Sequence, residues 1–262
     1  MDSLIYEQDG PIVTLTMNQP AKRNPLSGNS ILSDLVEACE RIHDDRSVRC
    51  VILTGAGPSF SSGGDIGILK QQQTPEITEM DIRHSYRRGI QRVAAALTNL
   101  DVPVIAAING HAIGAGLGLA CMCDIRIASD KAKMAASFIK LGIIPGDGST
   151  WMLTQIVGSA RAAELALTGD VIDAKQALAW NLVSQIVPDE ALMDAARAMA
   201  ERIAKNPSHG VRLTKRLLRE SLRAPFETVL ELSAIFQAVS HKTLDHVEAV
   251  DAFMEKRTPR FS

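Results

Sequence analysis

The sequence has few aromatic residues and no long hydrophobic run. Only 4% of its 262 residues are Phe, Trp or Tyr, although 46% are hydrophobic. Apolar stretches such as "VPVIAAI" are far shorter than the ~20 residues that a membrane-spanning helix needs. The beginning, "MDSLIYEQDGPIVTL", lacks the basic-then-apolar layout of a secretory signal. We therefore expect a globular, cytoplasmic protein with a sizeable core and no membrane contact.

The sequence also lacks an excess of charge of either sign, with 28 Lys and Arg against 30 Asp and Glu. This balance gives no sign of a nucleic-acid partner. One basic run, "RLTKRLLRESLR" at 212–223, places Arg and Lys at helical spacing. It is either an RNA-binding face or a solvated helix face. No aromatic residues are interleaved with these charges, which favours the solvated face.

Cysteine and histidine are scarce and form no ligand pattern. Cys121 and Cys123 are separated by one residue, so they do not form a CxxC motif, and no His follows at zinc-ligand spacing. We expect all four cysteines to be buried thiols in a reducing compartment. His241 and His246 are expected on a solvated helix face. The sequence predicts no metal site.

Hydrophobic patterns predict an α/β protein. Two β-rich runs around Asp9-Gly10 predict a hairpin. Continuous apolar runs at 48–55 and 103–109 are typical of strands covered on both faces. A long helix is predicted between them, at roughly 76–99. We predict a core over residues 1–190 and a helical segment over 191–262, with helix breaks before Pro207 and Pro225. Further elements are predicted as a helix near 28–44, strands in "DIRIAS" and "AKMAA", and a last strand at 182–187.

Glycine-rich turns follow two of the predicted strands, in "LTGAGPSFSSGGDI" and in "NGHAIGAGLGLACMCD". Neither is a dinucleotide fingerprint, because Phe60 and Leu119 stand where GxGxxG needs glycine, and no P-loop or GxSxG elbow occurs. A strand, a glycine turn and a short apolar helix therefore occur twice. Such turns can aim free backbone N–H groups at an oxyanion, or they can be corners that need glycine only for packing. Both interpretations stay open on spacing alone.

The combination of "FSSGGDI", "NGHAIGAGLGLACMCDIRIASDKAKM" and "LGIIPGDGSTWML" resembles the enoyl-CoA hydratase/isomerase (crotonase) superfamily. The resemblance runs from "VTLTMNQPAKRNPLS" to "AFMEKRTPRF". It implies a spiral of ββα units with a C-terminal helical trimerisation segment, hence a homotrimer or homohexamer. It also implies an acyl-CoA substrate whose thioester enolate is held by the backbone N–H groups of Gly64 and Ala115. Coenzyme A would be part of the substrate, and no other cofactor is implied.

The sequence departs from the hydratase pattern at the two positions where the resemblance implies catalytic glutamates. These positions hold Gly118 and Phe138, which carry no titratable group. Together they suggest a pocket for a bulkier acyl group, with Ser62 nearby. Asp147 is one residue away from the aspartate of family isomerases, so it is either the catalytic acid or a cap of the following helix. For CoA phosphates the candidates are Lys22, Arg23 and Lys256.

These departures favour isomerase-type proton transfer over simple hydration. Two alternatives remain. One is a catalytically inert acyl-CoA-binding protein that kept the backbone cradle and lost the acids. The other is an RNA-binding or scaffolding homologue that uses the basic run at 212–223.

Overall fold

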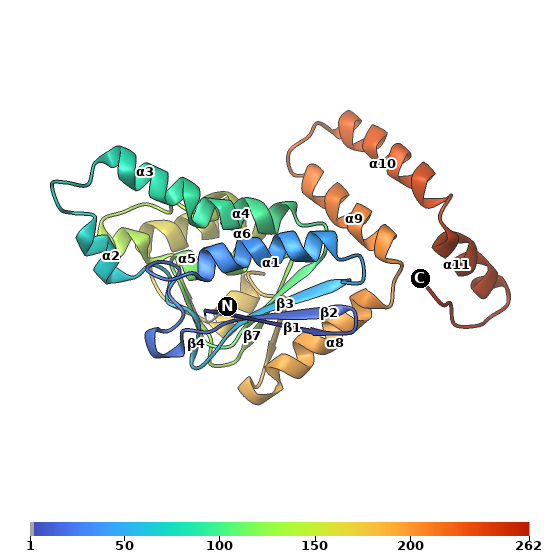
Figure 1. The fold of residues 1–262 in the computed structure, drawn as a ribbon, viewed down its shortest axis with the longest axis horizontal. Helices are drawn as coiled ribbons and strands as arrows, with labels where there is room; N and C mark the ends of the chain where they lie inside the picture. Colours follow the sequence, from blue (N-terminus) through green and yellow to red (C-terminus); the bar gives the residue numbers. More distant parts are fainter. Residues whose placement is uncertain (1–2, 262) are drawn as a thin grey trace.

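The larger of two β-sheets is a six-stranded sheet that runs through the middle of the molecule (Figure 1). The computed structural model describes residues 3–261. The strand order is β1-β2-β3-β5-β7-β10. β1 and β2 form the predicted antiparallel hairpin, in which Asp9 is paired with Ile12, and the other neighbours are parallel. The strands are β1 (Leu4–Asp9), β2 (Ile12–Met17), β3 (Cys50–Gly55), β5 (Val104–Ile108), β7 (Ile125–Ser129) and β10 (Gln185–Val187).

A second, four-stranded sheet alternates with the first along the chain. The pairs β3/β4, β5/β6 and β7/β8 each give one strand to each sheet, and a helical segment follows each pair. This succession is the predicted spiral of ββα units. The strands are β4 (Ser59–Ser61), β6 (His111–Ile113), β8 (Lys133–Ala135) and β9 (Ile172–Asp173), and the helical segments are α2 (Ile66–Gln71), α5 (Ala115–Cys121) and the 3-10 helix η2 (Ser137–Leu141).

Both faces of the large sheet are covered, which explains its continuous apolar runs. Side chains alternate along β3, so Val51 and Leu53 face the core that contains α1 (Ile31–Asp44) and α4 (Ile90–Asn99). Cys50 and Ile52 face the opposite side, against α8 (Leu192–Ala204). The contact residues of α8 are Leu192, Ala196, Ala200 and Ala204. Their spacing of four residues and small size place this helix flat on the sheet.

The single helix predicted at 76–99 is in fact two helices. α3 (Glu79–Arg88) ends and α4 begins at Gly89, whose φ of −99° and ψ of −111° are not helical. No residue of α3 is buried, whereas α4 buries Ile90, Val93 and Leu97. The apolar pattern concealed this break because only the second half of the stretch packs on the core.

The C-terminal helices extend away from the sheets, on the right of Figure 1. Four helices follow residue 190, and the breaks before Pro207 and Pro225 are confirmed. α8 packs on the sheet, α9 is hydrogen-bonded to the core, and α10 and α11 lie farther out. The boundary at 190/191 stays a prediction. The remaining helical segments are η1 (Pro20–Lys22), α6 (Ser149–Thr168), α7 (Ala174–Ala179), η3 (Asp189–Ala191), α9 (Ser208–Glu220), α10 (Phe226–Ser240) and α11 (Leu244–Met254).

Within residues 3–261, no helix combines the length and the apolar character needed to cross a membrane. All four cysteines are free and buried, as predicted. The rings of His241 and His246 form a T-shaped pair with centroids 4.5 Å apart on the C-terminal helical segment. In the described part of the chain, no three His, Cys, Asp or Glu residues are grouped so that they could hold a metal ion.

Candidate active site

The three parallel strands of the small sheet end at a common edge, above which a cavity of about 590 Å³ opens. The carboxyl ends of parallel strands are where α/β folds place ligands. The segments that follow β4, β6 and β8 all line this cavity, and so do the helices packed above them. The lining includes Ser62 and Gly64 after β4, Gly114 and Ala115 after β6, and Ser137 and Phe138 after β8, with Leu32, Ile68, Tyr86, Ile90, Ile143 and Asp147 around them.

Two backbone N–H groups of this cavity lack a partner. Ala115 is the first residue of α5, so its N–H has no acceptor within the helix. The N–H of Gly64 donates no hydrogen bond to any residue that the structure describes. Both residues line the cavity. The structure thus brings together the two residues that the sequence predicted as backbone donors.

Gly63 allows the two turns to approach each other. Its φ of +81° is in the left-handed region that favours glycine. A β-carbon at this position would overlap the carbonyl oxygen of Ile113 and lie 3.2 Å from the nitrogen of Ala115. The Gly63 N–H is held by Ser61 Oγ at 3.1 Å, and its carbonyl accepts the N–H of Leu26 at 2.7 Å. The loop is therefore fixed against the start of α5.

Asp147 is the only carboxylic acid among the described residues that line the cavity. Its side chain is 1% exposed. Oδ1 accepts hydrogen bonds from the N–H of Ser149 at 3.0 Å and from Ser149 Oγ at 2.6 Å. Oδ2 is buried and has no hydrogen-bond partner among the described residues. Burial raises the pKa of Asp147 above its ordinary value, and the two hydrogen bonds from Ser149 oppose this rise.

The structure bears out the capping interpretation of Asp147 for one of its two carboxyl oxygens. Gly148 is the N-cap of α6, and Asp147 precedes it, yet Oδ1 still binds the first N–H of the helix. One carboxyl oxygen thus does the work of a cap. The other, Oδ2, has no hydrogen-bond partner among the described residues and lies against Gly118.

Gly118 does not line the cavity, contrary to our expectation of a substrate-pocket residue. A β-carbon at 118 would overlap Oδ2 of Asp147 and lie 3.0 Å from its Cγ. The space left by the missing side chain is filled by the Asp147 carboxyl group. It therefore adds no room for an acyl chain, and the argument for a bulkier acyl group from Gly118 is wrong.

The other predicted pocket residues are placed as follows. Phe138 is 8% exposed and lines the cavity, and its ring lies beside Gly114 at the start of α5. Ser62 also lines it and is tied to the preceding loop, because its N–H donates to the carbonyl of Arg23 at 2.8 Å. Its Oγ donates to the carbonyl of Lys22 at 3.4 Å. Lys22 and Arg23 are exposed and stand at the end of η1; they are not among the described residues that line the cavity and are joined to it through these bonds to Ser62.

Lys256 is exposed and follows α11, on the helical segment that extends away from the sheets (Figure 1). It is not among the residues that line the cavity of its own chain. A single chain does not bring Lys256 together with Lys22 and Arg23.

Comparison with known proteins agrees with this arrangement. The sequence model of the family described as enoyl-CoA hydratase/isomerase matches residues 7–262. The chain belongs to the enoyl-CoA hydratase/isomerase family. It is 35% identical to the 1,2-epoxyphenylacetyl-CoA isomerase of Escherichia coli K12 over 262 residues, which covers 100% of this chain and 99% of the relative.

Hydratases of the family are about equally similar. Identity to the short-chain-enoyl-CoA hydratase of Clostridium acetobutylicum is 34%, over 98% of this chain and 96% of the relative. The crystal structure of an enoyl-CoA hydratase from Bacillus anthracis superposes with a TM-score of 0.92 at 34% identity, covering 99% of this chain and 98% of the other. Overall similarity therefore shows the enoyl-CoA hydratase/isomerase family and the fold, and the choice between the two reactions has to be argued from the residues of the site.

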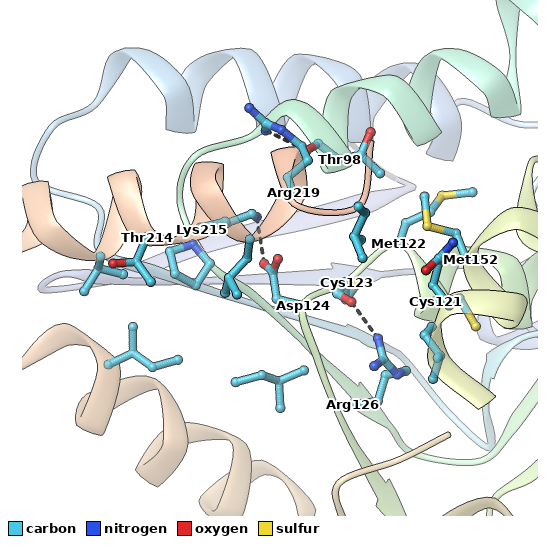
Figure 2. Close-up of a pocket in the computed structure, with 18 of the residues that line it drawn as sticks. Thr98, Cys121, Met122, Cys123, Asp124, Arg126, Met152, Thr214, Lys215 and Arg219 are labelled. Carbon is cyan, nitrogen blue, oxygen red and sulfur yellow. Dashed lines mark hydrogen bonds and ion pairs between the residues drawn. The ribbon is translucent and has the colours of Figure 1, made fainter. Parts of the chain in front are cut away.

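A second cavity of about 700 Å³ lies between α9 and the core, at the far end of α5 (Figure 2). Burial raises the pKa of the Cys121 thiol to about 12 and also raises the pKa of the Cys123 thiol, which disfavours the reactive thiolate form. Its charged groups are engaged: Lys215 Nζ is 2.7 Å from Asp124 Oδ2, and Arg126 donates to the carbonyl of Cys123 at 2.6 Å. The one carboxyl group among the described residues that line this cavity, that of Asp124, is therefore ion-paired.

The basic run at 212–223 proves to be largely an anchoring face. We expected a solvated helix face, but Lys215 is 9% exposed. Lys215 donates to the carbonyl of Val102 at 2.8 Å, Arg212 to that of Val48 at 2.9 Å and Arg219 to that of Thr98 at 2.8 Å. These three cations hold α9 to the core, and Arg216 and Arg223 are the exposed cations of the run.

No sequence pattern pointed to Tyr86, which reaches the cavity from α3. Its ring packs against Gly146, where a β-carbon would overlap it. Burial and the nearby Asp147 raise its pKa. Ser149 also contributes to the site, because it donates both hydrogen bonds to Oδ1 of Asp147. The order Asp-x-Ser at a helix start, typical of local side-chain to backbone bonds, could have identified it.

Proposed function

We propose that this protein is an acyl-CoA enzyme that moves a proton on the acyl chain through a thioester enolate. The observation that carries the proposal is the unpartnered Oδ2 of Asp147, a residue that lines the same cavity as two backbone N–H groups without acceptors. The carboxyl group of Asp147 can carry a proton, and the two N–H groups can donate hydrogen bonds to a negatively charged oxygen. Relatives in the family bear the names of CoA thioester enzymes.

In this mechanism the thioester carbonyl oxygen accepts hydrogen bonds from the N–H groups of Gly64 and Ala115. Asp147 Oδ2 removes a proton from the acyl chain, and the electron pair of the broken C–H bond delocalises onto the carbonyl oxygen. The same carboxyl group then returns the proton to a different carbon, which shifts the double bond. Backbone donors that are fixed before the reaction stabilise this charge well, because no reorganisation is needed.

The composition of the cavity favours proton transfer over water addition. Water addition in the family pattern uses two carboxylates, and the positions that correspond to them hold Gly118 and Phe138. Asp147 is the single acid of the described cavity lining, and its raised pKa suits a group that both takes and returns a proton. A site with one acid of this kind supports isomerisation.

The test is exchange of α-protons for deuterium in D₂O, followed by NMR, with butyryl-CoA and phenylacetyl-CoA as probes. In Asp147→Asn we expect exchange to fall by about 10²–10⁴-fold, while affinity for both thioesters stays within a few-fold of wild type. Asp173→Asn is the matched control, because Asp173 only caps α7, accepting the N–H of Gln176 at 2.8 Å. Unchanged exchange in Asp147→Asn would refute the assignment and favour the inert-binder alternative.

We further propose that the chain assembles in multiples of three. Large apolar side chains are exposed along α10 and α11, including Phe226 at 70%, Leu244 at 83% and Phe253 at 82%. Burial of these side chains between chains would remove apolar surface from water. In the same assembly, Lys22, Arg23 and a neighbouring chain's equivalent of Lys256 are our candidates for binding the CoA phosphates.

A further inference from the structure

In the proposed site, helix α5 packs closely against the segment at the start of α6 that carries Asp147. Gly118 is the fourth residue of α5, and its α-carbon faces the carboxyl group of Asp147. A β-carbon here would overlap Oδ2, the oxygen that has no hydrogen-bond partner among the described residues. A side chain of any size at 118 therefore competes with the one carboxyl oxygen that the mechanism uses.

The carboxyl group has no room to give way. Oδ1 is held by the N–H and the Oγ of Ser149, and the Cβ of Ser149 is itself 3.2 Å from the β-position of residue 118. On the other side, the ring of Tyr86 packs against the backbone of Gly146. Contacts this close leave no space for an added methyl group, because protein interiors are packed as densely as crystals of small organic molecules.

We propose that Gly118 is a positioning residue for Asp147, because the missing side chain at 118 leaves the room that the carboxyl group occupies beside the acyl cavity. This inference rests on the proposed function, since it assigns a catalytic purpose to the room that Gly118 leaves. It also implies a rule for the site. A side chain on α5 at 118 and the carboxyl group of Asp147 exclude each other, so the site takes its acid from one segment or the other and not from both.

A double-mutant cycle in thermal unfolding tests this rule and needs no activity assay. It compares wild type with Gly118→Ala, Asp147→Ala and the double variant. We expect Gly118→Ala to lower the unfolding midpoint by roughly 5–10 °C in the wild-type background. The same change should be nearly neutral in the Asp147→Ala background, where neither Cγ nor Oδ2 is present. Gly210→Ala is the control, because Gly210 lies in a helix, α9, with open space at its β-position. It should not lower the midpoint in either background.

The outcomes of the cycle are distinct. If Gly118→Ala does not fold alone but folds together with Asp147→Ala, the contact is confirmed. Equal destabilisation in both backgrounds, or failure of both variants to fold, would locate the clash elsewhere and overturn the inference.

The catalytic purpose is tested by deuterium exchange in Gly118→Ala, with phenylacetyl-CoA at saturation. We expect exchange to fall by about 10²-fold or more while affinity for the thioester changes by only a few-fold. Gly210→Ala should keep both. If the double-mutant cycle shows coupling but Gly118→Ala keeps full deuterium exchange, the positioning role is overturned. Full exchange in Asp147→Asn would instead refute the proposed function, and the two failures are therefore distinguishable.

Discussion

The buried ion pair between α9 and the core gives a quantitative prediction for the stability of the protein. Lys215 is 9% exposed and Asp124 is 34% exposed, and their charged atoms are 2.7 Å apart (Figure 2). The substitution Lys215→Met keeps most of the apolar stem and removes the ammonium group. It leaves Asp124 without its cation and the carbonyl of Val102 without its donor at 2.8 Å.

The magnitude follows from the environment of each partner. Breaking a fully buried pair by removing one charge costs about 3–5 kcal/mol. Here the cost is reduced, because Asp124 is one-third exposed and its Oδ2 still accepts the N–H of Val104 at 2.7 Å. We therefore expect Lys215→Met to lower the free energy of unfolding by about 2–3 kcal/mol.

The assay is urea unfolding followed by circular dichroism at one fixed protein concentration. Lys131→Met is the matched control, because Lys131 pairs with Asp189 at 3.2 Å on the surface, with 70% and 37% of the two side chains exposed. We expect no measurable loss in this control. If Lys215→Met loses no more stability than Lys131→Met, the cations of the run at 212–223 do not anchor α9, and the argument is refuted.

Three further predictions concern the site and the assembly. Ala115→Pro removes one proposed oxyanion donor at a first helical position, which tolerates proline, so the fold should persist while single-turnover proton exchange falls by about 10²–10³-fold. The pKa of Asp147 is raised in the folded state, so its contribution to stability is full below the unfolded pKa of about 3.9 and is lost as pH rises through the folded pKa. Urea unfolding from pH 4 to pH 8 should therefore show wild type losing stability relative to Asp147→Asn, and a constant difference would contradict the raised pKa. Light scattering at micromolar concentration should give a mass that is a multiple of three chains, and a clean monomer would refute the proposed assembly.

Local sequence patterns were sufficient for much of the fold. The Asp9-Gly10 turn predicted the β1–β2 hairpin, and the apolar runs at 48–55 and 103–109 predicted strands covered on both faces. The glycine turns predicted two strand-to-helix corners, and pairing of β4 with β6 brings these corners to one cavity. These features are set by residues close in sequence, through backbone conformation, hydrophobic periodicity and the free N–H groups of a helix start.

Features that depend on contacts between distant segments were not predictable in this way. The break at Gly89 is concealed by a continuous helical pattern, because what differs between its two halves is only which one packs on the core. The charges at 212–223 have the spacing of a solvated face, yet Lys215 and Arg219 find carbonyl acceptors in the core.

The same holds at the proposed acid. The sequence by itself determined the family, the backbone turns and the absence of acids at positions 118 and 138. Only the tertiary structure decided what takes their place, by laying the loop of Asp147 over Gly118 and Tyr86 over Gly146. The physical reason is that a glycine in a sequence does not show whether the space beside it is open or filled in the folded protein. The space that it leaves is open or filled according to which distant segment packs against it.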